Sequence, residues 1–159
     1  MKTNLLRKIL FSLLLLVAFS SPLLSQVEYT WDSHGIGFKA SSDMKVTVNK
    51  ADEFEATNGK ITLDIFPWQD ENINHDDLAD ATVAIAKDLK FDNIHGADAL
   101  EIQDFQGYYV MGSKDGVEAI IMTLLDKESS TNLIVTIVYE TGSQATAIKI
   151  ADSFYAYDK

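Results

Sequence analysis

The residues best suited to chemistry gather between positions 70 and 80, where acidic and amide side chains are crowded. The segment contains Asp70, Glu71, Asn72, Asn74, His75, Asp76, Asp77 and Asp80. Carboxylate and amide oxygens are the ligands that Ca²⁺ prefers, but the segment lacks the spacing of an EF-hand loop. Acidic residues also stabilise the first turn of a helix. The segment therefore predicts either a solvated helix start or an acidic site for Ca²⁺ or a basic peptide.

The three histidines do not form a metal-binding pattern. His34, His75 and His95 are far apart, and no pair has the spacing that would place two rings on one helix face. A zinc site needs three or four ligands that converge in space. Two of the histidines directly precede a glycine, which is typical of a turn. The sequence predicts no metal site and no cofactor.

Nucleophilic catalysis needs a nucleophile, a base and an orienting acid, and the sequence marks no such set. The chain has no cysteine and no Gly-x-Ser-x-Gly motif. Asp32, Ser33 and His34 are adjacent, but neighbouring side chains in a strand or turn point apart. With 24 acidic residues, a carboxylate pair for glycoside hydrolysis stays open, although nothing singles out two of them. We expect no catalytic residues and no enzyme, with a small hydrolase as an alternative.

Aromatic side chains are the remaining candidates for recognition. Pro67 is expected to end a strand and to leave Trp68 beside the acidic segment. An exposed Trp68 would anchor a partner, whereas a Trp68 packed beneath the following helix would close the core. Tyr108 and Tyr109 could add to the recognition of a partner. The predicted recognition surface comprises Trp68, Asp70, Glu71, Asp76, Asp77, Tyr108 and Tyr109.

Two helices are expected to position these residues. The first should span about 75–90, with Asn74 as its N-cap and acidic residues in its first turn. Its apolar face would contain Leu78, Thr82, Ile85, Ala86 and Leu89. The second helix is expected at about 143–155. Its inward stripe would contain Ala147, Ile148, Ile150, Ala151 and Phe154.

The remaining chain predicts strands separated by turns. Asn58-Gly59 is a strong hairpin signal, because both residues tolerate a positive φ. Two later segments, 117–125 and 133–139, are apolar on both faces, which is typical of central strands in a covered sheet. The expected strands are 27–31, 35–40, 44–48, 53–56, 60–66, 99–105, 107–112, 117–125 and 132–139.

These elements predict an α+β fold, in which an antiparallel sheet of about seven strands is packed by two helices. The covered central strands are compatible with two arrangements. The two helices could lie on opposite faces of the sheet. Alternatively, one helix and the N-terminal strands could cover the two faces.

The first 25 residues have the pattern of an export signal. Lys2, Arg7 and Lys8 precede the uncharged stretch Ile9–Phe19, and small residues follow it. This apolar run is shorter than the ~20 residues of a membrane-spanning helix. Cleavage after Ser25 would leave residues 26–159 as a single α+β domain without a stable membrane anchor. We expect an exported protein, either periplasmic or extracellular.

The charge of the chain limits the partners it could bind. Without its first 25 residues the chain has 10 lysines against 24 acidic residues, a net charge of −14, and no arginine. Nucleic acids, nucleotides and anionic lipids require positive surface and are therefore excluded. Proteins and neutral or cationic ligands remain. Without cysteine the domain must be stabilised by packing alone.

Four stretches of the chain carry a resemblance to a known family. They are Gly35–Lys39, Phe105–Val110, Ser130–Val135 and Ile150–Phe154. In these stretches the chain resembles the PsbP-like fold family, which includes exported bacterial domains and extrinsic subunits of the photosynthetic oxygen-evolving complex. The resemblance implies an antiparallel sheet packed by helices, a binding or accessory role, and no catalytic residue.

We therefore expect an exported, non-enzymatic binding or accessory domain. Two alternatives remain open at this point. One is an acidic domain that binds Ca²⁺ or a basic peptide, and the other is a small periplasmic hydrolase.

Overall fold

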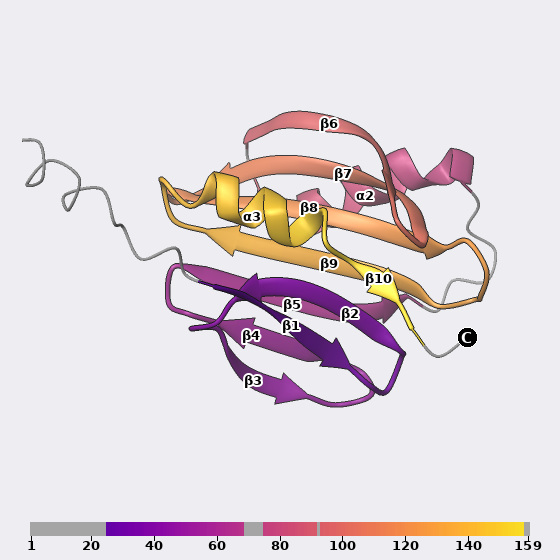
Figure 1. The fold of residues 1–159 in the computed structure, drawn as a ribbon. Helices are drawn as coiled ribbons and strands as arrows, with labels where there is room; N and C mark the ends of the chain where they lie inside the picture. Colours follow the sequence, from indigo (N-terminus) through magenta and orange to yellow (C-terminus); the bar gives the residue numbers. More distant parts are fainter. Residues whose placement is uncertain (1–24, 69–74, 92, 158–159) are drawn as a thin grey trace, which may run out of the picture.

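The described part of the chain folds into two antiparallel sheets and two α-helices (Figure 1). The structure was obtained as a computed structural model that describes residues 25–68, 75–91 and 93–157. The larger sheet has seven strands, and the smaller has three. The predicted α+β class, with an antiparallel sheet of about seven strands and two helices, is confirmed. The three-stranded sheet is an addition that the sequence did not predict.

The seven-stranded sheet is antiparallel at every pairing. Its strand order is β3-β4-β5-β9-β8-β7-β6. From the centre of the sheet to one edge, the last four strands therefore follow one another in reverse chain order. In that order the strands are β3 (Lys45–Asn49), β4 (Phe54–Thr57), β5 (Ile61–Trp68), β9 (Asn132–Tyr139), β8 (Val117–Asp126), β7 (Phe105–Lys114) and β6 (Asn93–Ile102).

The three-stranded sheet joins the two ends of the described chain. β2 (Ile36–Ser41) pairs on one side with β1 (Gln26–Trp31) and on the other with β10 (Tyr155–Ala156). The helical elements are a 3₁₀ turn, η1 (His75–Asp77), followed by α2 (Leu78–Asp88), and later α3 (Gln144–Ala151).

The two faces of the large sheet are covered differently. On one face, α3 and the three-stranded sheet lie side by side and share the main core with β5, β9 and β8. On the other face, α2 packs over β7 and β8. β8 shows why both covers are needed, since Ile120 and Met122 enter the main core while Ile121 packs beneath α2. Helices on opposite faces and N-terminal strands over one face are thus both present.

Both helices end earlier than expected. The segment predicted as a helix over about 75–90 begins with η1 and continues as α2 only to Asp88, and Asp77 is the N-cap of α2. The proposed cap Asn74 lies outside the described residues. α3 stops at Ala151 rather than at 155, because Phe154 stacks on Phe38 in the core and the following residues pair with β2.

The hairpin between β6 and β7 lies earlier in the chain than predicted. The expected strand 99–105 covers the last four residues of β6, the turn at residues 103–104 and the first residue of β7. The break expected between the strands 99–105 and 107–112 therefore lies inside β7. Gly107 is needed there for close packing, because a Cβ at this position would lie 2.1 Å from the Thr123 carbonyl oxygen.

Both edges of the seven-stranded sheet are irregular. The pairing of the edge strand β3 shifts register between Val46 and Val48. At the opposite edge, the pairing of β6 shifts between Ile94 and Gly96. Such bulges increase the local twist and interrupt the row of backbone groups that an edge presents.

In the ranges that the structure describes, no helix has both the length and the apolar character needed to cross a bilayer.

Candidate functional site

The structure places Trp68 on the face of the large sheet that α2 covers. Ile61, Leu63 and Ile65 point into the main core, so the alternate residues of β5 point to the other face. Phe66 is 37% exposed there, and Trp68 is half-buried. Trp68 is therefore neither sealed beneath the helix nor fully exposed.

The other predicted surface residues do not all join Trp68. Asp76 and Asp77 are exposed in η1, at the start of α2. Tyr108 packs against the cluster beneath α2, whereas Tyr109 packs against the main core on the opposite face. Asp70 and Glu71 lie outside the described residues. Tyr109 is thus separated from the other aromatic residues by the sheet itself.

Phe66 and Trp68 belong to a partly exposed apolar strip beside α2. Across the β5–β9 pairing, Phe66 lies opposite Ile134 and Thr62 lies opposite Val138. Ile134 and Val138 are half-buried on the same face of the sheet. We call Phe66, Trp68, Ile134 and Val138 the β5–β9 strip.

A carboxylate borders this strip. Asp64 lies between Thr62 and Phe66 on the same face, with Glu55 of β4 directly opposite. Burial, together with the smaller effects of the negative charges of Glu55 and Glu53, raises the pKa of Asp64 to about 6. The three acidic side chains make the border of the strip strongly negative at neutral pH.

The described histidines are held in separate local contacts. His34 Nε2 donates to the carbonyl oxygen of Ala51 at 2.6 Å. His95 Nε2 contacts the Glu118 carboxylate at 3.0 Å on the other side of the molecule. Within the described ranges, no three His, Asp or Glu side chains converge closely enough to hold a metal ion.

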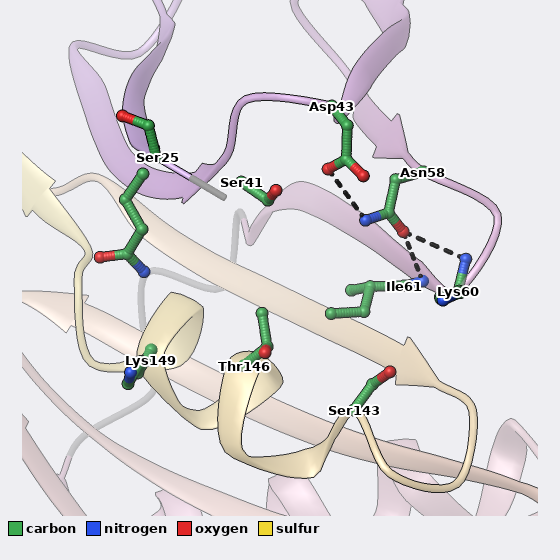
Figure 2. Close-up of a pocket in the computed structure, with 10 residues that line it drawn as sticks. Ser25, Ser41, Asp43, Asn58, Lys60, Ile61, Ser143, Thr146 and Lys149 are labelled. Atoms are coloured by element: carbon green, nitrogen blue, oxygen red, sulfur yellow. Dashed lines mark hydrogen bonds between the residues drawn. The ribbon is translucent and has the colours of Figure 1, made fainter. Parts of the chain in front are cut away.

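A polar cavity of about 660 Å³ lies where the β2–β3 and β4–β5 turns face α3 (Figure 2). Four hydroxyl side chains and two amides line it, together with Ile61 and three charged groups. The hydroxyls are those of Ser25, Ser41, Ser143 and Thr146. Sequence reasoning missed this cavity, because its walls come from parts of the chain that only the tertiary fold brings together.

The turns that form one wall are joined by Asn58. Its Oδ1 accepts hydrogen bonds from the backbone N–H groups of Lys60 at 3.1 Å and Ile61 at 2.9 Å. Its Nδ2 donates to Asp43 Oδ1 at 3.1 Å, which links the two turns (Figure 2). Asn58 was identified as a turn residue in the sequence, but its bond to Asp43 carries no sequence signal.

The Asp43 carboxylate is held in its ionised form. The nearby Ser41 hydroxyl is the main reason that the pKa of Asp43 is lowered, followed by the Asn58 amide. Ser41 Oγ is buried and makes no hydrogen bond of regular geometry among the described residues. The charges at this cavity are thus the Asp43 carboxylate and the ammonium groups of Lys60 and Lys149.

Comparison with known proteins identifies the fold. No protein-family model matches the chain, and no curated protein matches its sequence. Among solved structures, the Ran-binding protein Mog1p of Saccharomyces cerevisiae aligns with a TM-score of 0.59 at 11% identity, covering 85% of this chain and 97% of Mog1p. A mutant of Mog1 aligns over the same shares with a TM-score of 0.51, also at 11% identity.

A protein from Bacteroides thetaiotaomicron shows the same likeness. It aligns with a TM-score of 0.52 at 10% identity, over 86% of this chain but only 50% of its own length. At such identities the alignments establish a shared fold and nothing further. The chain thus has a Mog1-like α+β fold, and its PsbP-like resemblance stays a prediction.

Proposed function

We propose that the chain is an exported, non-enzymatic binding or accessory domain that recognises another protein through the β5–β9 strip. The observation that carries this proposal is the pair of aromatic residues, Phe66 and Trp68, that remain partly exposed on one sheet face beside α2. The Mog1-like fold supports a binding role, because Mog1p is a Ran-binding protein. The N-terminal export pattern supports a partner in the periplasm or outside the cell.

The strip has the composition of an interface centre. Partly exposed aromatic side chains gain most from burial against a partner, and such residues dominate the binding energy of many interfaces. The neighbouring Asp64 and Glu55 add negative charge at the border. A partner segment that combines aliphatic and basic residues would complement both features.

A pull-down from cell-envelope extracts tests this function. We expect the wild-type chain to retain a reproducible partner that the Phe66→Ala and Trp68→Ala variants lose. Ile148→Ala is the matched control, because Ile148 is 39% exposed, close to the 37% of Phe66, but lies on α3 at the other face. A partner that binds all variants equally, or no reproducible partner at all, would refute the proposal.

The carboxylates of Asp64 and Glu55 beside the β5–β9 strip favour a second candidate function, the binding of a basic peptide. In that case charge, rather than the burial of aromatic side chains, would supply most of the binding energy. Binding should then weaken steeply above ~0.15 M salt, because exposed charges are screened beyond about 8 Å. Glu55→Gln would weaken it more than Phe66→Ala does. An aromatic-centred interface predicts the opposite order and a shallow salt dependence.

A further inference from the structure

The cavity beside α3 has walls that are fixed before any ligand arrives. The Tyr29 hydroxyl contacts two carbonyl oxygens of the β2–β3 turn, those of Ser41 and Met44, each at 3.0 Å. The Ser42 N–H donates to the Ser25 carbonyl at 3.0 Å. Together with the Asn58 bonds, these contacts hold the wall that carries Ser41 and Asp43 in one arrangement.

The opposite wall is tied to the same frame. The Glu140 N–H donates to the Lys60 carbonyl at 3.0 Å, and the Ser143 N–H donates to the Glu140 carbonyl at 3.0 Å. α3 then follows with its buried residues Ala147 and Ile150 in the main core. The cavity therefore keeps its shape, which reduces the entropy that a ligand must overcome on binding.

α3 turns a polar stripe toward this space. Ser143, Thr146 and Lys149 recur at intervals of three residues, so they lie along one side of the helix. All three line the cavity opposite Asp43 and Asn58 (Figure 2). The stripe supplies two hydroxyls and one ammonium group.

The local charge is the reverse of the charge of the whole molecule. The chain has a formal net charge of −11, yet Lys60 and Lys149 outnumber the one carboxylate among the cavity residues. That carboxylate already accepts a hydrogen bond from Asn58. Ser41 is buried, at 6% exposure, and its hydroxyl, which lies near the Asp43 carboxylate, is a further polar group of the cavity wall.

We propose that this cavity binds a small hydroxylated carboxylate, about the size of a sugar acid. Lys60 and Lys149 lie toward opposite ends of the cavity in Figure 2, so one ammonium group would hold the carboxylate, while the other ammonium group and the hydroxyl and amide side chains would bind the ligand hydroxyls. A volume of about 660 Å³ is within the range of ligand sites. The site is separate from the β5–β9 strip and does not depend on the protein-binding role proposed above.

Nuclear magnetic resonance titration of the purified chain tests the site. Galacturonate, galactose and acetate serve as probes at low ionic strength, and backbone amide shifts report where each one binds. We expect galacturonate to shift the signals of Asn58, Ser143, Thr146 and Lys149 and to saturate at millimolar concentration. Galactose should produce no such shifts, and acetate should bind at least tenfold more weakly.

Single substitutions then test the assigned roles. Lys60→Ala and Lys149→Ala should each weaken galacturonate binding roughly tenfold, since each removes one charge-assisted contact. Both lysines are exposed, so the fold should persist in each variant. Lys87→Ala, at an exposed position on α2, is the matched control and should leave binding unchanged.

Several results would overturn the assignment. One is the absence of localised shifts with galacturonate. Another is a set of shifts spread over lysines elsewhere on the molecule. Equal binding by acetate, or an unchanged affinity in both cavity variants, would show that the hydroxyl or lysine contacts do not form.

Discussion

Gly107 is a position where a single atom decides whether two strands can pair. A Cβ there would lie 2.1 Å from the Thr123 carbonyl oxygen and 3.0 Å from Leu124 Cδ2. Backbone atoms of a central strand cannot move aside without breaking the β7–β8 ladder. Gly107→Ala should therefore lower the free energy of unfolding by about 3 kcal/mol or more, as measured by urea denaturation.

Gly96→Ala is the control for this substitution. Gly96 also faces β7, but its Cβ would meet Met111 side-chain atoms at 3.5 to 3.7 Å, which is ordinary contact. The loss in stability should stay below about 1 kcal/mol. Equal losses for the two variants would contradict the close approach at Gly107.

Asp64 should make the stability of the protein depend on pH. Its pKa of about 6 in the folded protein lies above the ordinary value of 3.8. Between about pH 4 and 6 the folded state therefore binds more protons than the unfolded state, so stability falls as the pH rises through this window. Above the window the penalty of the charged carboxylate is fully present.

Asp64→Asn should abolish this dependence and raise stability at pH 7 by about 1 kcal/mol. The full shift would correspond to about 3 kcal/mol, but the partly solvated carboxylate is screened. Glu55→Gln should lower the upper end of the window, because it removes a negative charge that raises the pKa of Asp64 in the folded protein. Urea midpoints measured from pH 4 to 8 check both variants, and a flat wild-type profile would be inconsistent with the raised pKa.

At the level of elements, a buried hydroxyl pair joins α2 to the sheet. Thr82 Oγ1 donates to the Leu78 carbonyl at 2.6 Å, and the Thr123 hydroxyl contacts Thr82 Oγ1 at 2.6 Å. Both threonines are fully buried. Because the Thr82 proton is used within the helix, Thr123 is the donor of the second bond.

A double-mutant cycle tests this pair. Thr82→Val should cost about 1–3 kcal/mol, because it leaves the Thr123 hydroxyl buried without its acceptor. Thr123→Val should cost less, since Thr82 keeps its bond to Leu78. The double variant should be more stable than the sum of the single losses predicts. Strict additivity in urea denaturation would mean that the two hydroxyls do not interact.

Elements that depend on local patterns were predictable from the sequence, and those that depend on distant contacts were not. The apolar runs of β8 and β9 identified the central strands, and Asn58-Gly59 identified its hairpin, where Gly59 has a φ of +85°. The end of α3 depends on Phe154 stacking with Phe38, 116 positions earlier, which leaves no local signal. The cavity beside α3 was not predicted either, because residues that are far apart in the sequence line it.

At the level of the whole molecule, the two sheets should unfold together. Trp31 of β1 is completely buried, donates from Nε1 to the Lys50 carbonyl at 2.6 Å, and packs against Phe54 of β4 with ring centroids 6.3 Å apart. The small sheet thus shares its core with the large one. Such sharing favours a single cooperative transition.

The fluorescence of Trp31 can be used to test whether the two sheets unfold together. In a Trp68→Phe background its fluorescence reports on the small sheet, while far-ultraviolet circular dichroism reports mainly on the larger one. The two unfolding curves should coincide in urea. A fluorescence transition that precedes the loss of circular dichroism would show that the small sheet detaches first.

The register shifts in β3 and β6 limit how copies of this molecule can associate. Each interrupts the backbone groups to which another chain would add a strand, and it does so at both ends of the sheet. Growth into fibrils by edge-to-edge addition is therefore disfavoured in both directions. Concentrated solutions of the protein should therefore remain free of such polymers. Copies of the molecule that associate should do so through the faces of the large sheet rather than through its edges.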